Sequence, residues 1–503
     1  MEDWNGILRR GTRNGRGMQA FSANMNCAQA DRPLPLAVDL DGTLLATDTL
    51  HEGVVAALLH APTSFPSLLR SLPQGRAAFK RSVSRQVPAD AAGLPLNRPF
   101  LEWLQQQRDL GRELHLVTAA DQTIADAVAN HLGLFKSATG SDGTRNLRSE
   151  EKATFLRRAF PDGFAYAGDS RHDLPVFAAA KEIVLVNASA TTSAAARTIN
   201  SSVIAEFPQS GSRLRTWISA LRIHQWSKNV LVLVPLVLGH KLGDATAIVH
   251  CVLGMLLLGL AASGTYLLND LSDLASDRMH RTKRSRAIAS GKIAPLHALA
   301  LAIILILIAL LLPLLFRPML SVAILGYCGL SMLYSAFLKR IALLDTLTIA
   351  ALFTIRLSLG VELADVPYSP WLIAFAGFFF FSLALAKRHC ELMEARVADS
   401  PALARRGWEV DDWPLTLGFG AAAAIGALQI MILYVADDAL PSRMYGHAAW
   451  LYVAPGAVAV WLMRVWLLAH RRELKDDPVI FALRDPWSWG IGAVVAAAIV
   501  MAL

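Results

Sequence analysis

Cysteine is scarce in this chain: there are 4 thiols in 503 residues, with no CxxC pair and no histidine at the spacing of a metal site. This scarcity argues against a disulfide framework and against a structural zinc site. Charged residues make up only 17% of the sequence, whereas 54% are hydrophobic. The formal net charge of +8 does not call for a nucleic acid partner, and we expect none, because membrane proteins collect Lys and Arg on one side of the bilayer.

The N-terminal stretch lacks a long hydrophobic run, which argues against a secretory signal peptide. We expect residues 1–32 to be disordered and residues 33–205 to form a soluble domain. A stretch rich in small and polar residues then predicts a linker at 206–220. Apolar segments of about the 20 residues that cross a bilayer recur beyond it, so residues 221–503 are expected to form an all-α membrane domain.

The membrane domain is expected to cross the bilayer nine times. The candidate spans are roughly 229–243, 247–268, 294–315, 317–338, 342–360, 370–386, 414–435, 447–469 and 487–503. The loops on one side of these spans contain seventeen Lys and Arg, and the loops on the other side contain three. The positive-inside rule therefore predicts a multi-pass protein of a bacterial cytoplasmic (inner) membrane, with its soluble domain in the cytoplasm.

The soluble domain alternates short apolar strands with helical stretches, which is typical of a parallel α/β sheet. The first strand runs into DLDGT, a second ends in LVTAA, and a later one ends in GDSRHD. Because the carboxyl ends of parallel strands meet at one edge of a sheet, these polar residues are expected to form one site with a lysine from a nearby helix. The residues of this candidate site are Asp39, Asp41, Thr118, Lys152, Asp169, Ser170 and Asp173.

These residue types suit phosphoryl transfer through an aspartyl phosphate. We expect Asp39 to be the nucleophile and Asp41 to act as general acid and base. Thr118 and Lys152 would hold phosphoryl oxygens. The carboxylates of Asp39, Asp41 and Asp169 would bind Mg²⁺, which prefers oxygen ligands.

Ser170 and Asp173 are expected to support this site, Asp173 by orienting Lys152. The four motifs resemble those of the haloacid dehalogenase (HAD) superfamily, and the resemblance covers about residues 35–190. It implies a Rossmann-like phosphatase domain with a mainly helical cap at about 49–100. The cap sequence does not name a substrate.

Acids and an amide close the second candidate span, in the stretch YLLNDLSDLASD. On a helix with about 100° per residue, Asp270, Asp273 and Asp277 fall within about 60° of one another, and Asn269 widens the arc to about 100°. Carboxylates on one face at the rim of a membrane repel each other unless a cation lies between them. The stretch therefore predicts a Mg²⁺ site that also holds the phosphates of a substrate.

The pattern NDxxDxxxD resembles the first aspartate motif of the UbiA-type intramembrane prenyltransferase superfamily, and the resemblance covers about 215–503. Members with aromatic acceptors usually carry a second aspartate-rich motif after the fourth span, where this chain has only Asp345. That departure resembles the decaprenyl-phosphate 5-phosphoribosyltransferase branch instead. Asp345 itself is expected to orient a ribose hydroxyl, to bind metal, or to cap the start of a helix.

Membership of that branch would imply two phosphorylated substrates, phosphoribosyl pyrophosphate and a polyprenyl phosphate, beside the lipid bilayer. Many cations would then be needed, although juxtamembrane cations also serve as topology signals. The expected substrate-binding residues are Gln225, Lys228, Asn229, Lys283, Arg286, Tyr334, Lys339, Asp345, Arg356, Lys387 and Arg388.

Together the two resemblances imply a bifunctional, Mg²⁺-dependent membrane enzyme. It would transfer 5-phosphoribose to polyprenyl phosphate and then remove the 5-phosphate, giving a lipid-linked ribose that could serve as precursor of an arabinofuranosyl donor. The main alternative is an aromatic-acceptor prenyltransferase attached to a phosphatase with a separate substrate. A transporter or scaffold with a vestigial soluble domain is a third hypothesis.

Overall fold

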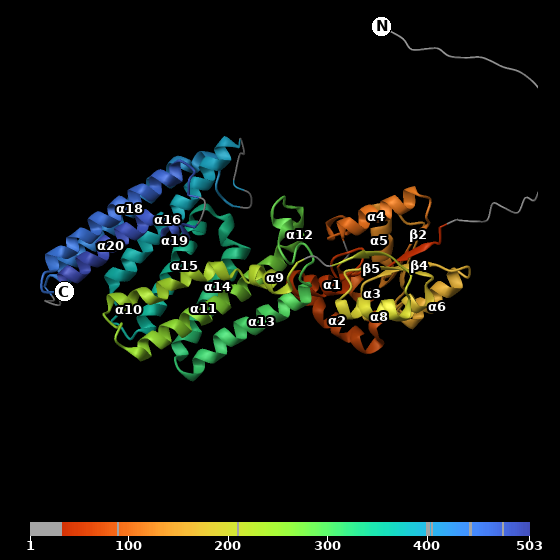
Figure 1. Ribbon diagram of the computed structural model, residues 1–503. Coiled ribbons are helices and arrows are strands. Elements are labelled where there is room, and N and C mark those ends of the chain that lie inside the picture. The colour runs from red at the N-terminus through yellow and green to blue at the C-terminus, as the bar shows by residue number, and fades with distance from the viewer. Residues whose placement is uncertain are drawn as a thin grey trace, which may run out of the picture.

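The computed structural model describes residues 33–87, 90–208, 211–398, 403, 406–441, 445–474 and 477–503. The chain forms an α/β lobe and a larger helical lobe, which meet near helices α1, α9 and α12 (Figure 1). The stretch 1–32, predicted to be disordered, lies outside the described residues.

Six parallel strands build the sheet of the α/β lobe, in the order β3-β2-β1-β4-β5-β6. Along β1, Leu36 and Val38 pack into the core on one face, and Ala37 packs into the core on the other. Burial of both faces is the usual state of a parallel sheet. The strands are β1 Leu36–Val38, β2 Leu114–Asp121, β3 Ser137–Ser141, β4 Ala165–Gly168, β5 Glu182–Val186 and β6 Val203–Phe207.

Helices cover both faces of this sheet. Buried side chains of α4 and α5 belong to one core, and those of α6, α7 and α8 belong to the other. The parallel α/β architecture predicted for this region is therefore confirmed. These helices are α4 Arg98–Asp109, α5 Gln122–Leu132, α6 Glu150–Ala159, α7 Leu174–Ala179 and α8 Ala190–Ile199.

A mainly helical insertion separates β1 from α4. It contains α1 Thr49–His60, α2 Phe65–Ser71 and α3 Arg76–Gln86, joined by short 3₁₀ turns. Ala57, Leu68 and Val83 form its small core. The insertion lies where the sequence predicts a helical cap.

The helical lobe contains seven helices long and apolar enough to cross a membrane among the described residues, or eight if the bent pair α19–α20 is one span. The predicted count of nine is not confirmed. The helices are α9 Arg213–Ala220, α10 Val234–Leu238, α11 Ala245–Ser272, α12 Leu274–Met279, α13 Pro295–Leu311, α14 Pro318–Ala336, α15 Ala342–Leu363, α16 Pro370–Val397, α17 Trp413–Tyr434, α18 Val453–His470, α19 Pro478–Arg484 and α20 Pro486–Ala502.

The first predicted span, 229–243, is not one long helix. The 3₁₀ segment Ile223–Leu233 and the short α10 occupy this region. The segment runs antiparallel to α11: the indole of Trp226 donates to Ser263, and Asn229 donates to the carbonyl of Met255. Polar anchors of this kind, together with Pro235, favour an irregular backbone over a continuous α-helix. The last predicted span is α20, which forms an 84° bend with α19.

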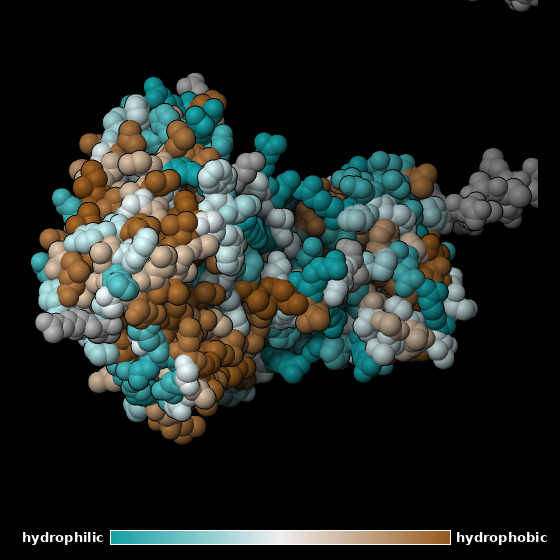
Figure 2. Space-filling view, turned by 60° about the vertical axis from the view of Figure 1, so that its left-hand side comes forward, coloured by the Kyte–Doolittle hydropathy of each residue, from teal (hydrophilic) through white to brown (hydrophobic). Residues whose placement is uncertain are grey.

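Hydrophobic side chains gather on the surface of the helical lobe, whereas the α/β lobe is largely hydrophilic (Figure 2). Because water-soluble proteins rarely expose apolar areas of this extent, the surface fits a lipid environment. The apolar helices and this surface indicate a multi-pass membrane protein.

The two lobes are joined by an apolar interface. Val55 of α1 packs into a core with Leu267 and Leu271 of α11 and with Ile288. The predicted linker, 206–220, contains the end of β6 and all of α9. The lobes therefore touch through packed side chains as well as through the chain that connects them.

Candidate functional sites

The carboxyl edge of the sheet brings the predicted acids and lysine of the α/β lobe together. Asp39 follows β1, Asp169 follows β4, and Lys152 lies in the first turns of α6. The Nζ of Lys152 is 3.0 Å from Oδ1 of Asp39 and donates to the hydroxyl of Tyr166 at 2.9 Å. Tyr166 in turn donates to Asp173, which also accepts from the backbone and hydroxyl of Ser170.

The loop after β1 approaches Asp169 so closely that only glycine fits at position 42. Gly42 has a φ of +78°, and a Cβ there would overlap the carboxylate of Asp169. Both the left-handed backbone and the lack of space favour glycine. The glycine in DLDGT thus lets the two acid-bearing loops lie against each other.

Burial and mutual repulsion act on the acids of this edge. Burial, followed by the charge of Asp48, raises the pKa of Asp41 to about 8. Burial, followed by the charges of Asp173 and Asp39, raises the pKa of Asp169 to about 8. Such an excess of buried negative charge is the setting in which a bound cation is stabilising.

The oxygens of Asp39, Asp169 and Asp173 lie within 4.8 Å of one another. Both oxygens of Asp173 already accept hydrogen bonds, so Asp39 and Asp169 are the better placed ligands. Hard carboxylate oxygens and an uncompensated negative charge fit Mg²⁺.

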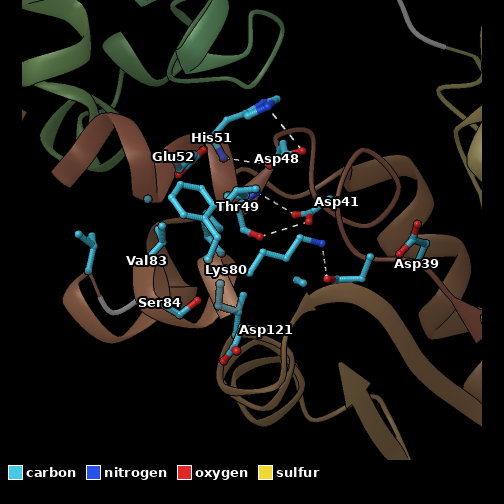
Figure 3. A pocket seen from close by; sticks show the side chains of 18 of the residues that line it. Asp39, Asp41, Asp48, Thr49, His51, Glu52, Lys80, Val83, Ser84 and Asp121 are labelled. Carbon is cyan, nitrogen blue, oxygen red and sulfur yellow. Dashed lines mark hydrogen bonds and ion pairs between the residues drawn. The ribbon is translucent and has the colours of Figure 1, made fainter. Parts of the chain in front are cut away.

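These acids line a cavity of about 740 Å³ together with residues of the helical insertion, among them Thr49, Lys80 and Val83 (Figure 3). Asp41 accepts from the backbone amide and the hydroxyl of Thr49 at the start of α1. Lys80 of α3 points into the cavity and donates to the carbonyl of Ala119 at 2.6 Å. Burial lowers the pKa of Lys80.

Thr118, predicted to hold a phosphoryl oxygen, is fully buried, and its hydroxyl accepts from the amide of Ala120. It is not among the residues that line the cavity, whereas Ala119, Ala120 and Asp121 are. Lys80 and Arg148 line the cavity and were missed by the sequence analysis, because no strand end or motif marks them.

A second cavity, of about 390 Å³, lies in the helical lobe at the end of α11. Among the residues that the structure describes, nine basic side chains line it against two acids, Asp273 and Asp477. Tyr266, Tyr327 and Tyr334 add aromatic walls. The basic residues are Arg222, Lys228, Lys283, Arg286, Lys339, Arg356, Lys387, Arg388 and Arg406.

The four predicted ligands at the end of α11 do not lie on one continuous helix. The helix ends at Ser272, Asp273 is its C-cap, and Asp277 belongs to α12. Acids at a helix C-terminus oppose the helix dipole, which disfavours extending the helix through them. The expected arc of carboxylates on one helix face is therefore not formed.

Each of these acids faces cations. Asp270 lies 2.7 Å from Arg222 and 3.0 Å from Arg286, and Asp277 lies 2.6 Å from Arg286. Asp270 and Asp277 are almost fully buried. Asp273 lies 3.5 Å from Lys339 and lines the cavity together with Asn269.

This arrangement fits Mg²⁺ only in part. Asn269 and Asp273 offer oxygens to the cavity, whereas Asp270 and Asp277 hold arginines behind it. Among the described residues, no group of three converging acids lies in the helical lobe. Mg²⁺ commonly uses one or two protein oxygens and completes its shell with water and substrate phosphates, which Asn269 and Asp273 could support.

Asp345 is the centre of a buried ion-pair cluster and is fully buried. Its carboxylate lies 2.7 Å from Arg388 and 2.8 Å from Arg406, and it accepts from the hydroxyl of Tyr334 and the indole of Trp408. These partners leave no role for it as the cap of α15, whose N-cap is Ile341. Asp345 holds two arginines and a tyrosine at the cavity wall.

Further predicted residues either line the cavity, as Lys228 and Arg356 do, or lie behind its wall. The Nζ atom of Lys228 lies 2.8 Å from a carboxylate oxygen of Asp477, the N-cap of α19. This ion pair connects the start of the helical lobe to α19. Asn229 accepts from Arg356, and Arg356 also donates to the hydroxyl of Tyr327. Asn229 and Gln225 are not among the lining residues.

Sequence reasoning did not predict several polar and charged lining residues, among them Arg222, Tyr327, Arg406 and Asp477. Arg222 lies three residues before the predicted Gln225, and its αL backbone (φ 50°) gives no sequence signal. Arg406 and Asp477 lie in charged loops whose composition is explained by membrane topology alone, so the sequence offers no reason to assign them to a site. Only the packing of α16, α19 and the following loops brings them to the cavity.

Comparison with known proteins places the helical lobe in a family. The model of the UbiA prenyltransferase family matches residues 231–498. A Sinorhizobium fredii (strain NBRC 101917 / NGR234) protein called uncharacterized protein y4nM is 44% identical over 476 residues, 94% of this chain and 92% of that one. The nodulation protein NoeC of Azorhizobium caulinodans is 30% identical over 275 residues, 54% of this chain and 87% of NoeC.

A decaprenyl-phosphate phosphoribosyltransferase of Mycolicibacterium smegmatis is 34% identical over 184 residues, which span 35% of this chain and 57% of that enzyme. The similarity to y4nM extends along nearly the whole chain and so includes most of the α/β lobe. The family model covers more than half of the sequence, and the chain belongs to the UbiA prenyltransferase family.

Proposed function

We propose that the helical lobe transfers 5-phosphoribose from phosphoribosyl pyrophosphate to a polyprenyl phosphate, and that the α/β lobe, as a HAD-type phosphatase, then removes the 5-phosphate. The product is a polyprenyl phosphoryl ribose. Both sites face the cytoplasm, as the distribution of Lys and Arg between the loops favours.

The observation that carries this proposal is the charge of the cavity in the helical lobe. Nine basic side chains and two acids line about 390 Å³. A prenyl diphosphate with an aromatic acceptor brings one diphosphate group to such a site, whereas phosphoribosyl pyrophosphate with a lipid phosphate brings a pyrophosphate and two further phosphate groups. Clustered Arg and Lys are suited to that larger charge. The similarity to a decaprenyl-phosphate phosphoribosyltransferase supports the same choice.

In the transferase reaction, an oxygen of the lipid phosphate attacks C1 of the ribose. The bond between C1 and the pyrophosphate oxygen breaks, and pyrophosphate leaves with the bonding electrons. Arg222, Arg286 and Lys339 are held at the cavity by Asp270, Asp277 and Asp273, so they can stabilise the leaving charge without first reorganising. Mg²⁺, where bound at Asn269 and Asp273, would add positive charge beside the same phosphates.

In the phosphatase reaction, the carboxylate of Asp39 attacks the phosphorus of the 5-phosphate. The bond to the ribose oxygen breaks, and Asp41 supplies its proton to that oxygen. Water then attacks the aspartyl phosphate, Asp41 takes the proton of that water, and inorganic phosphate is released. Lys152, 3.0 Å from Asp39, stabilises the negative charge on the phosphoryl oxygens.

A labelling experiment tests the transferase proposal. Membranes containing the protein are incubated with phosphoribosyl pyrophosphate labelled in the ribose and with decaprenyl phosphate. We expect label in the lipid fraction, and we expect Asp273→Asn with Lys339→Ala to lower the rate by at least about a hundredfold. Absence of label, together with prenyl transfer from a prenyl diphosphate to an aromatic acid, would overturn the proposal in favour of the aromatic-acceptor alternative.

A further inference from the structure

Helix α12 lies between the two cavities. Ala275 and Arg278 of this helix line the cavity of the α/β lobe, which holds the candidate phosphatase acids. Asp273, at the start of α12, lines the cavity of the helical lobe, and Asp277 binds Arg286 there. The short stretch from Asp273, the N-cap of α12, to Arg278 thus contributes lining residues to both cavities.

Arg278 makes a two-pronged ion pair with the other lobe. Its two Nη atoms lie 2.8 Å and 2.5 Å from the carboxylate oxygens of Glu52 in α1, and its Nε donates to the carbonyl of Ala289. The side chains of Arg278 and Glu52 are only 9% and 14% exposed. Both residues line the cavity that contains Asp39.

The stability of the interface between the lobes does not require the ion pair of Arg278 with Glu52. The apolar core around Val55 already joins α1 to the helical lobe. A buried ion pair contributes little net stability compared with apolar side chains of the same size, because both charges lose their hydration. A charged residue from the membrane lobe at the rim of a phosphatase cavity therefore points to recognition of an anion.

The proposed transferase product carries two phosphate groups. One is the 5-phosphate monoester, and the other is the phosphodiester that links the ribose to the lipid. When the monoester lies at Asp39, the phosphodiester has to lie on the side of the membrane lobe, because its polyprenyl chain stays in the bilayer. Within the described part of the chain, Arg278 is the basic lining residue that this lobe contributes to the cavity.

We propose that Arg278 is a specificity residue of the phosphatase: it exchanges Glu52 for the phosphodiester of the lipid-linked substrate. The phosphatase therefore favours a lipid-bound phosphoribose over soluble phosphate esters. This inference rests on the proposed function of the two lobes, and it adds the residue that connects them.

The test compares two phosphatase substrates with the full chain in detergent micelles. One substrate is synthetic farnesyl phosphoryl ribose 5-phosphate, and the other is ribose 5-phosphate, which lacks the phosphodiester. We expect Arg278→Ala to lower the kcat/KM for the lipid-linked substrate, relative to the kcat/KM for ribose 5-phosphate, by about tenfold or more. A loss of this size corresponds to the free energy of one charge-assisted hydrogen bond. Arg278→Lys is expected to lower this ratio less. Arg284→Ala, an exposed cation of the same loop, is the matched control and is expected to keep the ratio.

The variant Glu52→Gln distinguishes substrate binding by Arg278 from stabilisation of the lobe interface by the ion pair. It weakens the ion pair but leaves Arg278 in place, so the KM for the lipid-linked substrate is expected to fall. The inference would be overturned if Arg278→Ala changed kcat/KM equally for both substrates, so that their ratio stayed the same. It would also be overturned if Glu52→Gln behaved like Arg278→Ala. Because the lipid-linked substrate is supplied directly, failure of the transferase proposal would appear separately, as missing label from phosphoribosyl pyrophosphate.

Discussion

Asp345 holds together one wall of the cavity in the helical lobe. Its carboxylate lies within 2.8 Å of both Arg388 and Arg406 and accepts from Tyr334. Without that charge, two guanidinium groups would remain close together, and Glu391, the ion-pair partner of Arg388, would be left to offset both. The residue therefore acts on the substrate through the cations it positions.

We expect Asp345→Asn to lower the free energy of unfolding by about 3 kcal/mol, because buried Arg388 keeps its ion pair with Glu391 but loses the one with Asp345, and half-buried Arg406 also loses Asp345. The KM for phosphoribosyl pyrophosphate or for the lipid phosphate should rise about tenfold, since Arg388 and Arg406 lose their positions. Thermal melting of the purified protein and steady-state kinetics measure the two effects.

Asp365→Asn is the matched control, because the Asp365–Arg317 pair is on the surface and away from the cavity lining. It should change neither quantity appreciably. Equal behaviour of the two variants would contradict the role assigned to Asp345.

Sequence reasoning located individual residues well where a motif fixed them. Asp39, Lys152 and Asp169 come together as their strand ends predict, because parallel strands place their carboxyl ends at one edge. Arg406 and Arg222 were not foreseen, since a charged loop near a membrane has the same composition whether it binds phosphate or only sets topology.

At the scale of elements, the contact between the loop after α12 and the α/β lobe depends on Gly291. This residue has a φ of +77°, and a Cβ there would lie 2.6 Å from the carbonyl oxygen of Ala46. The backbone of one lobe therefore touches the backbone of the other at a position that excludes any side chain.

We expect Gly291→Ala to weaken the lobe interface by about 2 kcal/mol, through the left-handed backbone and the overlap with Ala46. Hydrogen exchange of α1 should increase, while exchange of β1 and β4 stays slow. Gly211→Ala is the matched control, since Gly211 has a φ of +104° with no atom near a Cβ. The same increase in α1 for both variants would show that backbone strain alone, and not the contact with Ala46, is responsible.

The long helices of the membrane lobe could be predicted, and seven of the nine predicted spans are present as such helices. Segment 229–243 was misjudged because an apolar run indicates burial but not backbone conformation. The 3₁₀ segment, anchored by Trp226 and Asn229, ends at Leu233, and Pro235 begins the short α10. The break of the helix at Asp273 was missed for a similar reason: ion pairs with residues far away in the sequence decide where the acids point.

At the scale of the whole molecule, α12 and its N-cap connect the linings of the two cavities: Asp273 lines one, and Ala275 and Arg278 line the other. A product released from one site starts close to the other, and tethering of this kind raises the effective concentration towards about the millimolar range. Under the proposed function, attachment of the polyprenyl chain to the membrane would confine the product further. The arrangement is expected to favour the two reactions in sequence on one polypeptide.

The most direct test of this account is mass spectrometry of the lipids formed by the wild type and by Asp39→Asn from phosphoribosyl pyrophosphate and decaprenyl phosphate. The account predicts decaprenyl phosphoryl ribose with the wild type, and its 5-phosphorylated form with Asp39→Asn, because the variant lacks the nucleophile but keeps the transferase cavity. The same dephosphorylated lipid from both proteins, or no ribosylated lipid from either, would contradict it.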